Sequence, residues 1–547
     1  MAIPDDIKLA LSNSLAECGI TFSPEQVPLE HPATLEHGDY SSSVALAKAK
    51  ESGLNPRALA EQISQNIGSV SGVEKIEIAG PGFINFSLTS AVFASTIQDA
   101  RGEGWGQGDV NKGKKIMVEY TDPNPFKEFH IGHLMSNAIG ESISRLLEFS
   151  GGEIKRANYQ GDVGPHVAKA IWGKIQLKDA TWGEAYVHGA AEYENHKDEI
   201  EKINKHVYEK DDSEINTLYE TGRTESLEEF EKIYKILGTK FDYYFFESDT
   251  APRGVGIVRA HPEVFVESDG AVVYKGEDEG LHTRVFVTSR GLPTYEAKEL
   301  GLAQLKGEIW GFDQSITITA NEQSDYFQVV LAAMHKVLPA VAFRIEHISH
   351  GMMRFADGKM SSRTGNVITG TSLLLDLTDA AKMRAGESRA ENSEKLAEQV
   401  AVAAIKYQIL KQGSGKDIVF DREKALSLEG DSGPYLQYAL ARTCAILAKA
   451  HDLGVLGKPD VAMNPNVVTK LVYRFPEIVA YAASKREPHL LTTYLTELAA
   501  AFNGWYAQEQ ILDGKPSAAH KVALVGAVQA TLRNGLWLLG IPAPEKM

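Results

Sequence analysis

One strand–helix–strand segment constrains the fold of this chain more than any other part of the sequence. A short apolar run at residues 116–120 has strand character, and a second strand-like run follows at 154–159. Between them, residues 132–148 place apolar side chains at helical spacing, and the Gly pair at 151–152 then ends the helix. This order predicts a βαβ unit, and therefore a doubly wound parallel sheet that binds its ligand at the carboxyl ends of the strands.

Two histidines stand at the start of this expected helix. His130 and His133 are three residues apart, with Gly132 between them. At that spacing both imidazoles share one helix face beside an N-terminus that favours anionic phosphate. Gly132 leaves the backbone open to a nucleotide base, while the histidines can donate hydrogen bonds to phosphate oxygens whose charge grows in the transition state. A His-x-x-His pair taken alone also fits two structural histidines or a metal site, but no third ligand of suitable spacing stands nearby.

A second polar segment, at residues 357–366, is punctuated by glycine and carries Lys359. Its composition suits a mobile loop that closes over a triphosphate, where Lys359 would neutralise the leaving pyrophosphate. A solvated turn is the alternative for such a segment on its own. Its occurrence in the same chain as His-Ile-Gly-His favours the first interpretation.

The remaining sequence indicates a multidomain protein, since 547 residues are enough for three or four domains. Residues 1–108 mix helical and strand-like runs and predict a small α+β domain. Residues 109–372 contain the parallel sheet, with a charged helical insertion outside the sheet at about 172–250. A helical connecting segment at 373–430 leads into a helical bundle at 431–547.

Composition excludes several classes of protein. Hydrophobic residues make up 43% and charged residues 24%, and no apolar run is long enough to cross a bilayer. The first residues lack the basic start and apolar block of a secretory signal, so we expect a cytoplasmic protein without a membrane partner. Cys18 and Cys444 are the only cysteines, which excludes a disulfide framework and a Cys-rich zinc site. No metal ligands and no protein-bound zinc are expected.

The formal charge of −17 argues at first against a nucleic-acid partner, because such affinity comes largely from neutralised phosphates. A local basic surface can still exist on an acidic protein. Lys112, Lys114 and Lys115 form one candidate cluster. A solvated linker and an RNA contact both remain open for it.

The chain resembles the class I aminoacyl-tRNA synthetases. Residues 130–133 match their HIGH signature and residues 359–363 resemble their KMSKS loop. Among these enzymes, the arginyl type is similar over nearly the full length. The further matching segments are Gly38-Asp39-Tyr40-Ser-Ser-Ser43, Asn55-Pro56-Arg57, Asn158-Tyr159-Gln-Gly161-Asp162, Pro293-Thr294-Tyr295-Glu-Ala-Lys298-Glu299, Asp417-Ile-Val-Phe-Asp421, Gly433-Pro434-Tyr435-Leu436-Gln437-Tyr438-Ala439 and the end from Asn534 to Met547.

The resemblance implies both an architecture and a reaction. The catalytic domain is expected to be a Rossmann-type α/β domain, between an N-terminal α+β domain that recognises the tRNA elbow and a C-terminal all-α bundle that binds the anticodon. The enzyme would activate L-arginine with ATP, with Mg²⁺ carried by ATP, and transfer arginine to tRNA(Arg), releasing AMP and pyrophosphate. We expect it to act as a monomer. The alternatives are another class I type, such as the glutamyl or cysteinyl enzyme, and a catalytically silent tRNA-binding paralogue.

The resemblance also assigns residues by position. The arginine-binding residues are Glu119, Asn124, Tyr295, Glu299 and Gln323. The ATP-binding residues are His130, Gly132, His133, Lys359, Met360, Ser361 and Ser362. The catalytic residues are His130, His133, Lys127 and Lys359, and the tRNA-binding residues are Tyr40, Ser43, Tyr435 and Gln437. A guanidinium offers five N–H donors in a fixed fork, which carboxylates and a Tyr hydroxyl can accept.

Three positions depart from the family pattern. Glu299 stands where the arginyl type usually has Asp, which adds a methylene to the expected contact with the substrate. Ser43 replaces an Asn that many relatives carry, while Tyr40 is expected to remain available for stacking. Ser362 replaces the second lysine of the KMSKS loop, and Lys127, three residues before His130, is expected to compensate for the lost charge.

Overall fold

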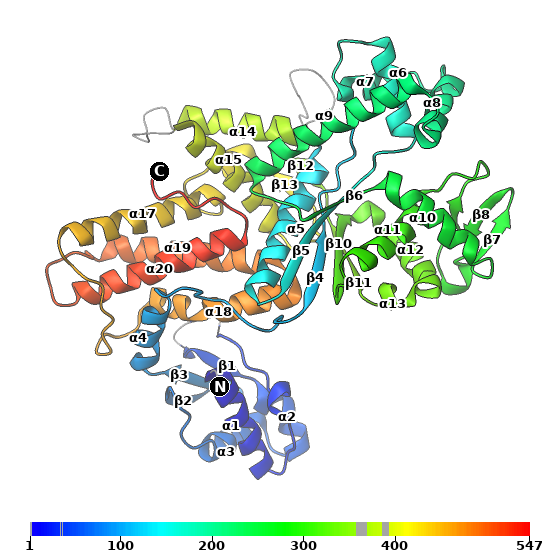
Figure 1. Cartoon of the computed structure of the whole chain (residues 1–547). Coiled ribbons are helices and arrows are strands. Elements are labelled where there is room, and N and C mark those ends of the chain that lie inside the picture. Colours follow the sequence, from blue (N-terminus) through cyan, green and yellow to red (C-terminus); the bar gives the residue numbers. More distant parts are fainter. Residues whose placement is uncertain (1–2, 33, 35–36, 357–368, 385–392) are drawn as a thin grey trace. The chain divides into compact units, whose positions relative to one another are not determined.

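The structure of this chain is a computed structural model that describes residues 3–32, 34, 37–356, 369–384 and 393–547. It forms two compact units, which are described separately (Figure 1). Unit 1 comprises Met1–Trp105, Arg442–Pro476 and Leu498–Thr531. Unit 2 comprises Gly106–Ala441, Glu477–Glu497 and Leu532–Met547.

A five-stranded parallel sheet lies at the centre of unit 2. Its order is β11-β10-β4-β5-β6, and every neighbouring pair is parallel. The strands are β4 (Lys115–Glu119), β5 (Glu153–Gln160), β6 (Tyr243–Phe246), β10 (Gln314–Ala320) and β11 (Ile345–His350). From β4, the chain first adds β5 and β6 on one side and later adds β10 and β11 on the other. The strand order therefore reverses between β4 and β10, and doubly wound sheets bind their ligands at such a position.

Helices lie on both faces of this sheet. Figure 1 shows α5 (Ile131–Phe149) on one side and α11 (Tyr295–Ile309) on the other. Leu302 of α11 packs in one apolar cluster with Met117 and Phe245 of the sheet. On α5, a Cβ added at Gly140 would stand 2.2 Å from Cγ of Tyr120, so the helix approaches the end of β4 very closely. The predicted βαβ unit and the doubly wound parallel sheet are confirmed.

A helical insertion follows β5. Its helices are α6 (Pro165–Gln176), α7 (Trp182–Ala191), α8 (Lys197–Glu209) and α9 (Ser213–Leu237). The expectation that the whole range 172–250 lies outside the sheet is wrong, because β6 within it pairs in parallel with β5. This edge strand has only four residues, Tyr-Tyr-Phe-Phe, and such a short aromatic run gives no alternating pattern that separates it from the neighbouring helices.

Smaller elements complete unit 2. Strands β7 (Phe265–Ser268), β8 (Ala271–Tyr274) and β9 (Arg284–Val287) form an antiparallel sheet, and β12 (Met353–Phe355) pairs in parallel with β13 (Ile418–Phe420). The other elements are α10 (Glu247–Ala260), η3 (Glu277–Glu279), η4 (Asn321–Gln323), α12 (Ser324–Val337), α13 (Pro339–Ala342), α14 (Gly370–Arg384), α15 (Ser393–Leu410) and α16 (Arg422–Ala425). Within the described residues, 373–384 and 393–430, the expected connecting segment is mostly helical and also contains β13.

The N-terminal part of unit 1 is an α+β domain, as predicted. Its sheet is antiparallel in the order β1-β3-β2, and α1 and α3 bury Leu11, Leu59 and Ile63 against Phe86 of the sheet. The elements are α1 (Ile3–Glu17), η1 (Pro24–Gln26), β1 (Tyr40–Ser42), α2 (Val44–Ser52), α3 (Pro56–Asn66), β2 (Val73–Ala79), β3 (Phe83–Leu88) and α4 (Ser90–Asp99).

The C-terminal region is helical, which confirms the predicted bundle. Its helices are α17 (Gly433–Asp452), α18 (Val467–Lys485), α19 (Pro488–Gln508) and α20 (Ala518–Leu538). Across the described part of the chain, no helix has both the length and the apolar character that a membrane span requires.

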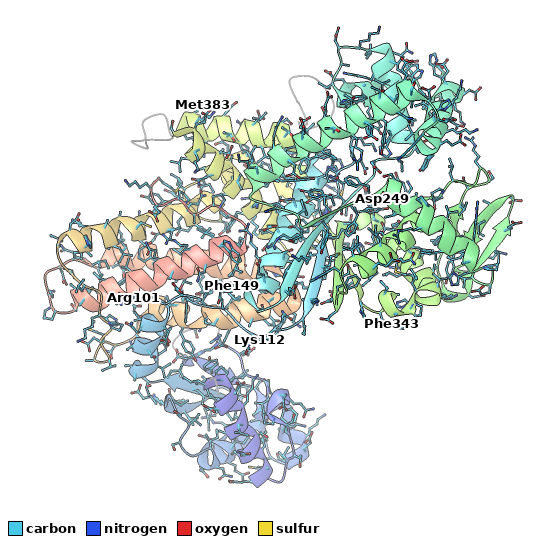
Figure 2. The ribbon with its side chains drawn as sticks, viewed as in Figure 1. Arg101, Lys112, Phe149, Asp249, Phe343 and Met383 are labelled. Carbon is cyan, nitrogen blue, oxygen red and sulfur yellow. The ribbon has the colours of Figure 1, made fainter. Side chains whose placement is uncertain are left out.

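The basic cluster before β4 is exposed. Lys112, which Figure 2 labels, and the neighbouring Lys114 and Lys115 all have exposed side chains. Lys114 donates a hydrogen bond to Asn111, and Lys115 lies over the ring of Trp310. Exposure fits a solvated linker and an RNA contact equally, so both interpretations stay predictions.

Candidate active site

A cavity of about 470 Å³ opens at the carboxyl ends of β4 and β10, where the strand order reverses. It brings together all the arginine-binding residues predicted from the sequence and every predicted ATP-binding residue that the structure describes. These are Glu119, Asn124, His130, Gly132, His133, Tyr295, Glu299 and Gln323. Lys359, Met360, Ser361 and Ser362 lie outside the described residues.

The loop between β4 and α5 has a strained backbone. Thr121, Asp122 and Phe126 have φ values of 83°, 48° and 71°, a region that non-glycine residues seldom adopt. Ser136 of α5 accepts the Thr121 N–H at 3.0 Å, and Ser226 of α9 accepts the Phe126 N–H at 3.0 Å. Strain of this kind persists where surrounding contacts fix it, which is common at functional sites.

Two side chains of this loop hold the end of the neighbouring strand. Asp122 Oδ1 accepts the N–H of Tyr159 at 2.7 Å, and Asn124 Oδ1 accepts the N–H of Gly161 at 3.0 Å. A Cβ at Gly161 would stand 2.4 Å from Asn124 Oδ1, so glycine is required for this approach. Because its oxygen is bound to the backbone, Asn124 has its amide N–H groups left for a ligand in the cavity.

His130 and His133 form a stacked pair. Their ring centroids are 3.4 Å apart, with 22° between the planes, and the backbone N–H of His130 donates to Nδ1 of His133 at 3.2 Å. Burial lowers the pKa of His130 and moves the pKa of His133 well below its ordinary value, and Lys127 lowers both further. Both imidazoles are therefore neutral at neutral pH and act as hydrogen-bond donors. Since Nδ1 of His133 accepts, its proton is on Nε2.

Gly132 lies against the ring of His130. A Cβ at this position would stand 3.0 Å from Cε1 and 3.1 Å from Nδ1 of that ring. A side chain at this position would press on the His130 ring, so glycine suits the stacked arrangement of the two histidines.

Four carboxyl groups line the same cavity, from Glu119, Asp122, Glu247 and Glu299. Burial and, to a smaller extent, the charge of Glu119 raise the pKa of Glu299 to about 8, although Lys306 opposes the shift. Burial and Glu119 likewise raise the pKa of Asp122 well above its usual range. Glu119 itself forms an ion pair with Lys306, with 2.5 Å between Oε2 and Nζ. The cavity thus favours a ligand that brings positive charge.

Sequence reasoning missed Asp122, Glu247 and Lys306. Glu247 lines the cavity and forms a buried ion pair with Lys298 at 2.5 Å, and burial raises the pKa of this carboxyl. Its position directly after β6 was an available signal, because the carboxyl ends of parallel strands meet at one edge. Lys306 lies seven residues after Glu299 on α11 and therefore on the same face of that helix.

Tyr295 and Gln323 enter the cavity from two different elements. Tyr295 is the first residue of α11 and is 55% exposed, which excludes a core aromatic at this position. Gln323 ends η4, the turn that follows β10. The two residues are therefore placed at ends of elements, where side chains reach a ligand.

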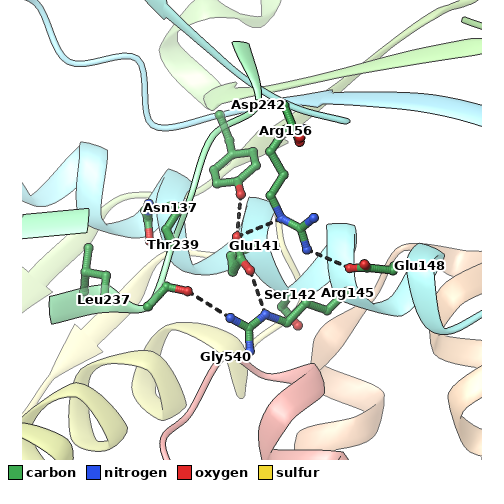
Figure 3. Close-up of polar contacts among 12 residues, drawn as sticks. Asn137, Glu141, Ser142, Arg145, Glu148, Arg156, Leu237, Thr239, Asp242 and Gly540 are labelled. Atoms are coloured by element: carbon green, nitrogen blue, oxygen red, sulfur yellow. Dashed lines mark hydrogen bonds and ion pairs between the residues drawn. The ribbon is translucent and has the colours of Figure 1, made fainter. Parts of the chain in front are cut away.

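The helix that carries the histidines is anchored through Glu141. Its carboxylate lies between the guanidinium groups of Arg145 and Arg156, at 2.6 and 3.2 Å, and accepts the hydroxyl of Tyr120 at 2.5 Å (Figure 3). Arg145 also donates to the carbonyl of Trp537 at 2.8 Å. Because Tyr120 follows Glu119 directly, these contacts tie α5, the end of β4 and the C-terminal segment of unit 2 to one carboxylate.

Comparison with known proteins identifies the family. A family model described as "tRNA synthetases class I (R), catalytic domain" matches residues 100–422, "DALR anticodon binding domain" matches 436–547, and "Arginyl tRNA synthetase N terminal domain" matches 5–88. The chain is 31% identical to the arginine–tRNA ligase of Clostridium perfringens, over 95% of this chain and 96% of that protein. It belongs to the arginyl-tRNA synthetase family.

Further relatives agree with this assignment. The arginine–tRNA ligase of Fusobacterium nucleatum is 32% identical over 93% of each chain. The solved structure of Thermus thermophilus arginyl-tRNA synthetase has a TM-score of 0.82, 26% identity and 99% coverage of both chains. The Plasmodium falciparum arginyl-tRNA synthetase, at 22% identity and a TM-score of 0.80, shares the fold over 100% of this chain and 99% of its own.

In this member of the arginyl-tRNA synthetase family, the cavity lined by the two histidines is not lined by Lys127. It lines an adjoining cavity of about 420 Å³, and its Nζ lies 4.9 Å from the ring centroid of Tyr186 on α7. Burial lowers the pKa of Lys127, whereas the charge of Glu247 opposes this shift. The residue is near enough to lower the pKa of both histidines, but it faces the insertion helices.

Two of the residues assigned to tRNA contact are buried. Tyr40 is 1% exposed, stacks on His31 and shares a 2.9 Å hydrogen bond between its hydroxyl and that of Tyr473. Its neighbour Asp39 forms an ion pair with Lys470 at 2.9 Å. The expectation that Tyr40 is available for stacking is therefore wrong for this conformation, because its ring and hydroxyl pack inside unit 1.

The side chain of Gln437 also forms its hydrogen bonds within the protein. Its side chain is fully buried and donates from Nε2 to the carbonyls of Gln399 and Pro542 at 3.1 and 2.8 Å. The assignment of Gln437 to tRNA contact is thus corrected, since it holds the C-terminal segment instead. Ser43, before the first residue of α2, and Tyr435, in the first turn of α17, are partly exposed, and their tRNA contacts stay predictions.

Proposed function

We propose that this chain is an arginine–tRNA ligase that acts in two steps. In the first, a carboxylate oxygen of L-arginine attacks the α-phosphorus of ATP, and the bond to pyrophosphate breaks. In the second, a hydroxyl of the terminal ribose of tRNA(Arg) attacks the carbonyl carbon of the adenylate, and AMP leaves. Neither step needs a covalent nucleophile from the protein, so catalysis consists of positioning and charge stabilisation.

Arginine is proposed to occupy the carboxyl-lined part of the cavity. Glu119 and Glu299 supply acceptors for the positive charges of the substrate, and the Tyr295 hydroxyl adds another. Asn124 and Gln323 carry amide groups suited to the α-amino and α-carboxylate end. A planar guanidinium, which never loses its charge, fits such a pocket better than any other standard side chain.

ATP is proposed to bind beside the histidines, with Mg²⁺ on its phosphates. Gly132 leaves space for the nucleotide, and neutral His130 and His133 donate to the α-phosphate as its charge grows. Lys127 and Lys359 are proposed to neutralise the pyrophosphate, and Met360, Ser361 and Ser362 are proposed to bind ATP with them. Ser362 carries no charge, which gives Lys127 a larger share of this role.

The tRNA is proposed to contact the N-terminal domain, residues 1–108, and the anticodon-binding helices, residues 431–547. The catalytic domain at 109–372 and the connecting segment at 373–430 lie between them in sequence. Among the residues assigned to tRNA, the partly exposed Ser43 and Tyr435 remain the candidates. We propose that the enzyme works as a monomer in the cytoplasm.

One observation carries the proposal: four carboxyl groups and two stacked neutral imidazoles share a single cavity at the switch point of the sheet. The test is aminoacylation of total tRNA by the purified protein with each standard amino acid and ATP. Arginine alone should support charging. Charging with glutamate or cysteine would replace the proposal by another class I type, and tRNA binding without any charging would establish the silent paralogue.

A further inference from the structure

A buried lysine that no motif marks lies beside the carboxyl groups of the proposed arginine pocket. Lys306 is 3% exposed, and its Nζ lies 2.5 Å from Oε2 of Glu119, which is 1% exposed. Burying such a pair costs desolvation energy that the mutual attraction of the two charges only partly offsets. The stability of the fold alone therefore does not explain this pair, and its place at a ligand cavity suggests a role in binding.

The surroundings of this pair are crowded with carboxyl groups. Asp122 comes from the loop after β4 and Glu299 from α11, and the charge of Lys306 lowers the pKa of both. Glu247, which also lines the cavity, is already paired with Lys298. The hydroxyls of Tyr159 and Tyr326 stay protonated, because burial raises their pKa well above the ordinary value. Among the described residues, Glu119 is the ion-pair partner of Lys306.

Like charges so close together cannot all ionise at neutral pH without a cation among them. Burial and the charge of Glu119 already favour the protonated forms of Asp122 and Glu299. Without Lys306, Glu119 would be a buried carboxylate with no counter-charge beside other carboxyl groups. It would also lose the contact that orients its oxygens as acceptors for the substrate.

We propose that Lys306 is a positioning residue for arginine recognition, whose ammonium group balances the charge of the Glu119 carboxylate and orients it in the empty pocket. The inference rests on the proposed function. Lys306 acts through Glu119 and does not itself touch the substrate. Arginine therefore meets a carboxylate whose position is already set before the substrate binds.

The test is the pH profile of kcat/KM for arginine in Lys306→Met, which keeps the volume of the side chain and removes its charge. At pH 7 we expect KM for arginine to rise about tenfold or more, with KM for ATP unchanged, because one unit of pKa corresponds to a tenfold change in ionisation. The acid limb of the profile should move to higher pH. The difference in kcat/KM between the variant and the wild type should become smaller above pH 9. Lys306→Arg should restore the wild-type profile.

The matched control is Arg253→Met, which breaks an exposed ion pair between α10 and Glu308 on the same helix as Lys306. It should leave the profile unchanged. The double variant Lys306→Met with Glu119→Gln leaves no unpaired charge behind, so it remains informative where the single variant unfolds. Its profile should match that of Glu119→Gln alone.

The outcomes separate the two proposals. The positioning role is overturned if kcat/KM for arginine falls equally at every pH in Lys306→Met. It is also overturned if the acid limb shifts further in the double variant than in Glu119→Gln. In either case, arginine charging by the wild type still upholds the proposed function. Absence of arginine charging by the wild type overturns both.

Discussion

The backbone N–H of His130 donates to Nδ1 of His133, so the first histidine fixes the tautomer of the second while their rings stack 3.4 Å apart. This contact leaves the Nε2 proton of His133 free to donate. The lowered pKa of both rings keeps them neutral, and a neutral donor near the α-phosphate gains strength only as negative charge develops there. The pair is thus built to favour the transition state over bound ATP.

Replacement of either histidine by alanine should therefore reduce the rate of adenylate formation by about 10² or more, with little change in arginine affinity. Arginine-dependent exchange between ATP and pyrophosphate, measured in the presence of tRNA, reports this rate. Equilibrium binding of arginine to the same variants provides the control. An unchanged exchange rate would remove the histidine concerned from the mechanism.

Arginine affinity should depend on pH through Glu299. Its pKa of about 8 in the empty protein means that the carboxyl is largely protonated at pH 6, whereas the guanidinium binds the ionised form. The Kd for arginine should therefore fall as pH rises from 6 to 8, by up to about tenfold per pH unit, and level off above. Calorimetry in buffers of different ionisation enthalpy should also detect proton release on binding.

Glu299→Gln gives the matched comparison, because it removes the titration and keeps the shape of the side chain. It should raise KM for arginine much more than KM for ATP, and its Kd should vary less with pH. Equal increases in both KM values would indicate a folding defect instead.

Lys127 is expected to share the neutralisation of pyrophosphate with Lys359. Lys127→Ala should abolish most of the ATP–pyrophosphate exchange, and Ser362→Lys in that background should restore part of it by returning a cation to the loop. Lys174→Ala is the control, since Lys174 lines the same adjoining cavity and lies over the ring of Trp182. No recovery in the double variant would show that a charge at position 362 cannot replace Lys127.

Tyr40 offers a test between a structural role and a role in base stacking. Tyr40→Phe keeps the ring but loses the hydroxyl that bonds to Tyr473, so it should lower the free energy of unfolding by about 1 kcal/mol. Denaturant unfolding measures this change, with the partly exposed Tyr506 changed to Phe as the control. A residue that only stacks on tRNA would show no loss of stability in Tyr40→Phe.

The sequence predicts the elements that depend on neighbouring residues well. It predicts contacts between residues far apart in the chain poorly. Periodicity and the Gly pair at 151–152 are local, and the predicted strand–helix–strand unit is confirmed at β4, α5 and β5. The family resemblance places eight residues that line one cavity. Lys306 was missed because its partner Glu119 is far away in sequence, and the ion pair exists only after α11 packs on the sheet. The burial of Tyr40 depends in the same way on Tyr473.

Lys406 of α15 is buried near Glu141, since both side chains approach Gly540. Its Nζ donates to the carbonyls of Leu237 and Gly540 at 2.6 and 2.8 Å. Burial and, to a smaller extent, the charge of Arg145 lower the pKa of Lys406 to about 7, although Glu141 opposes the shift. In the unfolded chain the same amine has a pKa of about 10.4. Between about pH 7 and 10 the unfolded chain therefore binds a proton that the folded chain does not, so this group makes the free energy of unfolding rise with pH.

Lys406→Met removes this dependence and, at every pH, the two hydrogen bonds to carbonyls. The difference in unfolding free energy, wild type minus variant, should accordingly increase from pH 7 to pH 9.5, by several kcal/mol at most, since each unit of pKa shift corresponds to about 1.4 kcal/mol. Denaturant unfolding followed by Trp fluorescence at pH 6.5, 8 and 9.5 measures it. Lys424→Met, at a side chain that is 80% exposed in the same unit, should give a difference that does not vary with pH. A difference for Lys406→Met that is flat, or that shrinks as pH rises, would mean that Lys406 stays charged in the folded protein and that Glu141 outweighs burial.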